Sequence, residues 1–202
     1  LFTAVPLQLD APFALKFLAG FMALGLYSSK LSFAFLAGAE MMGRPGDFAY
    51  SFDMAREAGL HLTCHAGEWG GPQMVRDTMR DLHVERLGHG FQCIEDADVL
   101  AEVIERGVVL EVCPGSNVAL QAVPNWEAHP IEKLREAGAK VTVSTDDPPF
   151  FLTTMTNEYE NLNRVFGWGD VEFAAAQQTA LAAAFCDDAT RTLLAKRLEA
   201  TT

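Results

Sequence analysis

Residues 57–68 read EAGLHLTCHAGE, and this stretch decides the fold class. A helix-like segment ends at residues 57–59 on Gly59, because glycine readily supplies the left-handed residue that stops a helix. The mostly apolar run Leu60–Cys64 follows at once and has the length and composition of a buried strand. The stretch therefore indicates the step from helix to strand in a βα repeat.

The same pattern recurs along the chain. Helix-like segments at residues 98–106 and 131–137 stop at Gly107 and Gly138, and an apolar run follows each glycine. Strands are predicted at Phe33–Leu36, Leu60–Cys64, Glu85–Gly88, Val108–Cys113 and Val141–Thr145. Strands that alternate with helices predict a parallel sheet in an α/β protein.

The C-terminal part has a different pattern. Residues 158–166, 171–185 and 188–198 read as consecutive helices without a strand between them, and Asp170 is the expected N-cap of the second. No interdomain linker, charge block or low-complexity segment interrupts the sequence.

Polar residues follow the predicted strands. Because the carboxyl ends of parallel strands lie on one face, residues after different strands are expected to converge there. The candidates are His65, Glu68, His89, Asp146 and Asp147. Small or turn-forming residues beside them (Gly67, Gly88, Gly90, Gly115 and Pro148) are expected to let the backbone approach a ligand closely.

These residue types favour metal-assisted hydrolysis. Imidazole and carboxylate together suit Zn²⁺, which can generate a hydroxide nucleophile at neutral pH. A neighbouring carboxylic acid can protonate a substrate, and a histidine can relay protons. Taken singly, a histidine at a strand end is usually structural, and Asp-Asp-Pro is usually a turn or a helix cap. Their joint placement favours the functional interpretation.

Five short motifs resemble the adenosine deaminase family. They are LAGAE at 36–40, HAGE at 65–68, RLGHG at 86–90, CPGSN at 113–117 and STDDP at 144–148. The resemblance runs from about residue 35 to the C-terminus. It implies a (β/α)₈ TIM-type barrel with one catalytic zinc. It also implies an enzyme that hydrolyses adenosine or deoxyadenosine to inosine or deoxyinosine and ammonia.

The resemblance also implies roles for individual residues. His65 and Asp146 resemble the zinc ligands, and Glu68 resembles the acid that protonates purine N1. His89 resembles the residue that holds and helps deprotonate the water at the zinc. Asp147 resembles a partner of that water and of purine N7, and Gly38 resembles the backbone donor to N3.

The sequence departs from the family pattern in its first part. The family carries a His-x-His pair that supplies two further zinc ligands, but none of the five histidines here forms such a pair or precedes His61. Five strand candidates stand where a closed barrel needs eight. Residues 31–202 are therefore interpreted as the C-terminal part of an incomplete barrel. Residues 1–30 are interpreted as an atypical apolar leader.

Composition narrows the possible partners and the location. The sequence has 15 Lys+Arg and 27 Asp+Glu, and the resulting net charge of −12 disfavours nucleic acid as a binding partner. Four cysteines without a C-x-x-C pair are expected to be reduced thiols in a cytoplasmic protein. The apolar segment 11–27 fits a buried helix better than a membrane span, or it is foreign to the natural fold. The expected partner is a small molecule, a purine nucleoside, and no association with a membrane is expected.

Three alternatives to an adenosine deaminase stay open. An adenine deaminase or another aminopurine deaminase would share the same motifs. A truncated, non-catalytic relative would explain the missing His-x-His pair. A two-metal hydrolase with a bridging lysine is disfavoured, because no lysine lies between Lys30 and Lys133.

Overall fold

The computed structural model describes residues 33–199. The leader expected over residues 1–30, and the choice between a buried helix and a membrane span for 11–27, lie outside the described residues. The described chain divides into two compact units, one ending at Glu102 and the other beginning at Val103.

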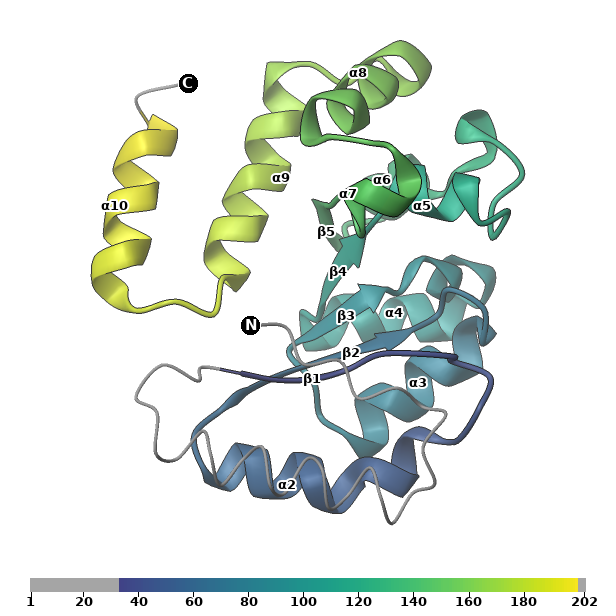
Figure 1. Cartoon of the computed structure of the whole chain (residues 1–202), viewed down its shortest axis with the longest axis vertical. Coiled ribbons are helices and arrows are strands. Elements are labelled where there is room, and N and C mark those ends of the chain that lie inside the picture. Colours follow the sequence, from purple (N-terminus) through teal and green to yellow (C-terminus); the bar gives the residue numbers. More distant parts are fainter. Residues whose placement is uncertain (1–32, 200–202) are drawn as a thin grey trace. The chain divides into compact units, whose positions relative to one another are not determined.

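The first unit is a three-stranded parallel sheet with helices against it. Strands β1 (Phe33–Leu36), β2 (His61–Ala66) and β3 (Arg86–His89) lie in this order. The connecting elements are η1 (Pro45–Phe48), α2 (Ala49–Glu57), α3 (Gly71–Asp81), η2 (Phe91–Glu95) and α4 (Ala97–Arg106), the last of which crosses the unit boundary. Helix α2 packs on β1 and β2, and α3 packs on β2 (Figure 1).

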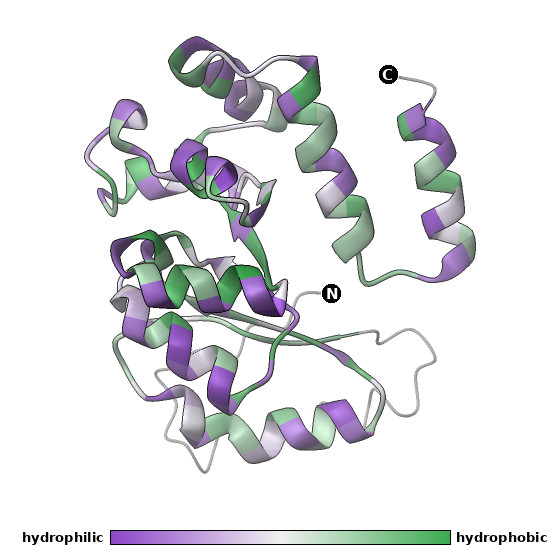
Figure 2. Cartoon of the chain, turned by 180° about the vertical axis from the view of Figure 1, so that it is seen from behind, coloured by the Kyte–Doolittle hydropathy of each residue, from purple (hydrophilic) through white to green (hydrophobic). Residues whose placement is uncertain are grey.

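Amphipathic patterning explains how these helices cover the sheet. Helix α3 buries Val75, Thr78 and Met79, which lie on one helical face at positions i, i+3 and i+4. Figure 2 shows hydrophobic and hydrophilic residues alternating along α3 and α4. The side chains of Phe52, Leu62, Met79, Leu82 and Leu87 are fully buried. Burial of such a side chain contributes about 1.5–3 kcal/mol, so this unit has a core of its own.

The second unit contains one parallel strand pair and most of the helices. Strand β4 (Val109–Val112) pairs with β5 (Lys140–Val143). The helical elements are α5 (Pro114–Ala119), η3 (Trp126–Ala128), α6 (Ile131–Glu136), α7 (Pro148–Phe151), α8 (Met155–Phe166), α9 (Asp170–Ala183) and α10 (Asp188–Glu199). Helix α9 packs beside β5, and α10 packs beside α9 (Figure 1).

The five predicted strands are confirmed, β1 with the predicted ends and the other four with ends shifted by one or two residues. The predicted helix stops are also confirmed, because Gly59, Gly107 and Gly138 all have positive φ, at 75°, 66° and 90°. The N-cap prediction for Asp170 is wrong by one residue. Gly169 is the N-cap, and its N–H donates to the Glu172 carboxylate at 2.9 Å, so Asp170 becomes the first residue of α9.

Two further observations concern the part of the chain that the structure describes. None of the helices within residues 33–199 is long and apolar enough to cross a membrane. The cysteines in this part, Cys64, Cys93, Cys113 and Cys186, form no disulfide.

Candidate active site

The carboxyl ends of β1, β2 and β3 bring the first group of candidate residues together. The strands are parallel, and their register pairs Leu36 with Cys64 and Ala66 with His89. The loops that follow the three strands therefore emerge side by side. His65, Glu68 and His89 come from these strand ends, and Gly38 lies in the loop after β1.

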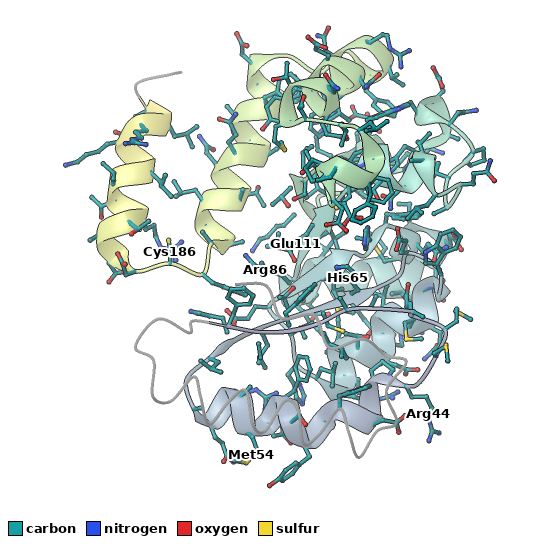
Figure 3. All side chains as sticks on the ribbon, in the orientation of Figure 1. Arg44, Met54, His65, Arg86, Glu111 and Cys186 are labelled. Atoms are coloured by element: carbon teal, nitrogen blue, oxygen red, sulfur yellow. The ribbon has the colours of Figure 1, made fainter. Side chains whose placement is uncertain are left out.

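His65 lies between two aromatic rings on the sheet. Its ring centroid is 5.0 Å from that of Phe35 and 4.7 Å from that of His89, both in edge-to-face arrangements. Figure 3 labels His65 on its strand. Across the β2–β3 register His65 faces Gly88, and a Cβ atom at Gly88 would lie 2.1 Å from His65 Cδ2. Gly88 thus makes room for the imidazole rather than for a ligand, which corrects the expectation for this glycine.

Glu68 and His89 are two titratable side chains of this group that lie close together. Glu68 Oε2 lies 3.5 Å from His89 Nε2, and the two side chains are 12% and 2% exposed. A buried carboxyl beside an imidazole is suited to proton transfer to and from a ligand. The structure therefore brings the two predicted catalytic residues together within the first unit.

The backbone at His89 is unusual. His89 has φ 61°, and the next residue, Gly90, has φ 67°. A left-handed conformation is uncommon for a residue with a side chain, and such residues concentrate at functional sites. The reversal of the chain there ends β3 and fixes the direction in which the imidazole leaves the sheet.

A buried carboxylate supports the loop that carries Glu68. Glu40, which follows β1 and is 7% exposed, accepts the backbone N–H groups of Gly67, Glu68 and Trp69. A glutamate side chain is rarely buried unless its carboxylate oxygens accept hydrogen bonds. Glu40 lies in the LAGAE motif, but no role for it was predicted from the sequence.

The second unit holds Asp146 and Asp147 after β5. Asp146 Oδ2 accepts the hydroxyl of Ser116 at 2.7 Å, and Asp146 itself has φ 59°. The hydroxyl of Ser116, from helix α5 after β4, therefore orients one carboxylate oxygen of Asp146. Asp147 is exposed at the N-cap of α7, where its backbone carbonyl accepts the N–H of Phe150.

A second buried glutamate holds the N-terminal turn of α5. Glu158 of α8 is fully buried, and its carboxyl accepts the N–H of Gly115 at 2.9 Å and the hydroxyl of Thr153 at 2.7 Å. Burial raises the pKa of Glu158 above its usual value, partly offset by these two hydrogen bonds. A Cβ atom at Gly115 would lie 2.2 Å from Glu158 Oε1, so this glycine too makes room for a side chain.

His129 has a structural environment. Its Nδ1 accepts the N–H of Ile131 at 3.1 Å, and its Nε2 lies 3.2 Å from Asn117 Oδ1. These partners select the neutral tautomer with the proton on Nε2. Burial lowers the pKa of His129 to about 4, which favours the same neutral form. Buried and bonded in this way, His129 has a structural role.

The predicted site residues thus form two groups, one in each unit. Gly38, His65, Glu68 and His89 belong to the first unit, and Asp146 and Asp147 belong to the second. Sequence reasoning assigned no role to Glu40, Ser116 or Glu158. Ser116 stands in the CPGSN motif, as Glu40 stands in LAGAE, whereas Glu158 lies in a helix without any motif.

The donor chemistry fits zinc in kind. The imidazole of His65 and the carboxylate of Asp146 are ligand types that zinc takes. Gly88 leaves room for the His65 ring, and the Ser116 hydroxyl donates a hydrogen bond to the Asp146 carboxylate. A catalytic zinc takes three protein ligands, so these two predicted ligands require further donors.

Comparisons with known proteins agree with the motifs and the fold. The family profile described as adenosine deaminase matches residues 26–201. An adenine deaminase from Rhizobium rhizogenes is 51% identical over 163 residues, which are 81% of this chain and 51% of that protein. One from Agrobacterium fabrum is 48% identical over 81% of this chain and 50% of that protein. The chain therefore spans about half the length of the curated relatives it matches.

Solved structures show the same fold. An adenine deaminase from Arthrobacter aurescens superposes with a TM-score of 0.90 at 31% identity, covering 97% of this chain and 59% of that one. An amidohydrolase from Burkholderia ambifaria with bound Zn superposes with a TM-score of 0.84 at 25% identity, covering 98% and 58%. The prediction of a β/α barrel fold, present here in part, is confirmed, and this chain belongs to the adenosine deaminase family.

Proposed function

We propose that the protein carrying this chain hydrolyses an aminopurine to the corresponding oxopurine and ammonia, and that its substrate is adenine. The observation that carries the reaction class is the pair of a largely buried Glu68 and a buried His89 beside His65. The choice of adenine over adenosine rests on relatives of about 50% identity that are adenine deaminases. This choice replaces the nucleoside that the sequence motifs alone favoured.

The proposed reaction divides the proton transfers between two residues. Protonated Glu68 donates to a ring nitrogen of the purine, which makes the amino-bearing carbon electrophilic. His89 holds the attacking water and takes its proton. The water oxygen adds at that carbon, and the proton stays on the imidazole of His89. The amino group leaves as ammonia after it receives a proton. Adenine and water thus give hypoxanthine and ammonia.

Gly38 and Asp147 would bind the substrate. The backbone N–H of Gly38 would donate to the purine, and Asp147 would accept from the water or the ring. Both assignments rest on the family motifs. The positive φ of Gly38, at 132°, suits a loop whose backbone turns toward a ligand.

In this proposal His65 and Asp146 would hold a zinc ion. Zinc would supply a water of lowered pKa and so a nucleophile at neutral pH. Further ligands would have to come from outside the two groups described above. The proposed site is that of a cytoplasmic enzyme acting on a small molecule.

The test uses two forms of the protein. The first is the purified 202-residue chain, and the second is the chain completed with the segment of the Rhizobium rhizogenes adenine deaminase that the match leaves uncovered. Zinc is measured by mass spectrometry, and ammonia release is measured with adenine, adenosine and deoxyadenosine. We expect about one zinc per molecule in the completed form and turnover with adenine as the preferred substrate.

The other outcomes have distinct meanings. Faster turnover of adenosine would contradict the choice of adenine but leave the reaction class standing. A completed form that binds zinc and turns over none of the three purines would exclude a deaminase of these substrates.

A further inference from the structure

Glu40 and the loop after β2 are joined by an arrangement that follows from the sheet register. Strands β1 and β2 are parallel and pair Leu36 with Cys64, so the loop after β1 runs beside the loop after β2. Gly38, with φ 132°, turns the first loop, and Glu40 follows it into a buried position. Its carboxylate therefore lies beside the backbone of the loop that carries Glu68.

Three consecutive backbone N–H groups converge on this carboxylate. Gly67 donates to Oε1, while Glu68 and Trp69 donate to Oε2 at 3.0 and 2.8 Å. Successive N–H groups that point into one concavity form an anion-binding nest. Hydrogen bonds to an ionised acceptor are about twice as strong as neutral ones. The loop is thus fixed on both sides of the residue that carries the proposed catalytic acid.

The glycines around the loop allow this close approach. A Cβ atom at Gly70 would lie 2.8 Å from Glu40 Oε1 and 2.7 Å from Met74 Cβ. Gly67 has φ 81°, a conformation in which glycine is favoured, and a Cβ atom there would lie 2.3 Å from Val75 Cγ2. The sequence around Glu68 is therefore adapted to a carboxylate at position 40.

We propose that Glu40 is a positioning residue for the deamination, which holds the backbone at residues 67–69 so that the Glu68 side chain is directed to the His89 side of the site. This inference rests on the proposed function, since it assigns Glu40 to the same reaction. Glu40 acts through Glu68, and the 3.5 Å separation of Glu68 Oε2 and His89 Nε2 is the geometry that it maintains.

Glu40→Gln isolates the acceptor chemistry at nearly constant size. The amide has one acceptor oxygen instead of two, so at least one of the three N–H groups faces an NH₂ group. The matched control is Glu85→Gln. The Glu85 carboxylate also accepts a backbone N–H of β2, that of Leu62 at 3.2 Å, but it does so at the opposite end of the strand. Both substitutions remove one charge and one acceptor from the surroundings of β2.

The first measurement is made on the completed form of the protein defined above. It follows amide hydrogen exchange in the peptide that spans residues 66–70. We expect exchange at residues 67–69 to be about 10-fold faster in Glu40→Gln, because a hydrogen bond that protects these amides is lost. Glu85→Gln is expected to leave this peptide unchanged. Unchanged exchange in Glu40→Gln would overturn the inference, whether or not the protein turns over a purine.

The second measurement is steady-state kinetics of the same variants with adenine. A misplaced general acid stabilises the transition state less well but leaves substrate binding nearly unchanged. We therefore expect kcat to fall roughly 10- to 100-fold while KM changes less than about threefold. Normal kcat in Glu40→Gln, or an equal loss in Glu85→Gln, would leave Glu40 a purely structural residue and overturn the inference. Absence of turnover in the unmodified protein would instead contradict the proposed function, and the exchange result would then decide the role of Glu40 alone.

Discussion

The imidazole of His65 occupies the space that a side chain at Gly88 would fill. The two residues are direct partners in the β2–β3 register, and a Cβ atom at Gly88 would lie 2.1 Å from Cδ2 and 2.8 Å from Nε2 of the ring. The orientation of the proposed metal ligand is therefore determined by the residue that faces it on the next strand.

Gly88→Ala should displace His65 and weaken zinc binding. The new methyl group would overlap Cδ2 of the ring, and overpacking of this kind costs about 1–3 kcal/mol of stability. Zinc content after dialysis and the urea midpoint of the completed protein measure the two effects. Gly46→Ala is the control, because its methyl group would meet only the flexible carboxylate of Asp81 at 3.1 Å. Full zinc occupancy in Gly88→Ala would show that His65 is not a ligand.

Glu68→Gln should lower kcat for adenine by roughly 10²- to 10⁴-fold, the usual contribution of a general acid. The amide keeps the size of the side chain, so the circular dichroism spectrum and the urea midpoint should stay close to those of the unmodified protein. Glu57→Gln, an exposed position near the end of α2, provides the control. A variant at Glu68 with a full rate would refute its assignment as the acid.

Ser116→Ala should weaken zinc binding about 10- to 100-fold, because the hydroxyl that orients Asp146 Oδ2 is removed. Asp146→Ala should remove zinc more completely. Zinc dissociation constants from competition with a chromophoric chelator compare the two. Thr192→Ala removes a hydroxyl from the exposed surface of α10 and should have no effect. Equal affinities in all four proteins would exclude Asp146 as a ligand.

Acid should destabilise the fold through His129. Its pKa is about 4 in the folded chain against about 6.5 when unfolded, so below pH 6.5 the unfolded state binds a proton that the folded state does not. The stability contributed by the neutral ring is present above pH 6.5 and is lost by about 1.4 kcal/mol per pH unit down to pH 4. Urea midpoints at pH 7 and pH 4.5 measure this loss.

His129→Gln removes the titrating group and should reduce the difference between the two midpoints. The comparison isolates His129 from Glu158, whose contribution has the opposite sign. Because burial raises the pKa of Glu158, its stabilising protonated form is present at low pH and is lost as the pH rises. An unchanged midpoint difference in His129→Gln would refute the pKa assigned to His129.

The sequence was a good guide to the strands and to part of the site. Most of the strands carry short, mainly apolar runs, and the glycines at 59, 107 and 138 end the helices before three of them, so local patterns were sufficient. Convergence of His65, Glu68 and His89 followed from the shared polarity of parallel strands. Local patterns could not predict the N-cap of α9, because it depends on the reach of the Glu172 side chain.

The supporting residues needed the structure. No sequence pattern marks Glu40 or Glu158 as buried, and only the strand register and helix packing bury them against backbone N–H groups. Gly88 and Gly115 were expected to make room for a ligand, but each is opposed by a side chain of the protein. Contacts of this kind join segments 27 to 43 residues apart, as for Gly67 with Glu40 and Gly115 with Glu158, and no sequence periodicity encodes them.

The left-handed backbone at His89 has a consequence for engineering. A glycine or asparagine would adopt φ 61° with less strain, so a search for thermostable variants would favour either one at this position. The same substitution would remove the imidazole beside Glu68. Selection for heat resistance alone would thus discard the proposed active site, and position 89 should be held fixed in any stabilisation library built on this fold.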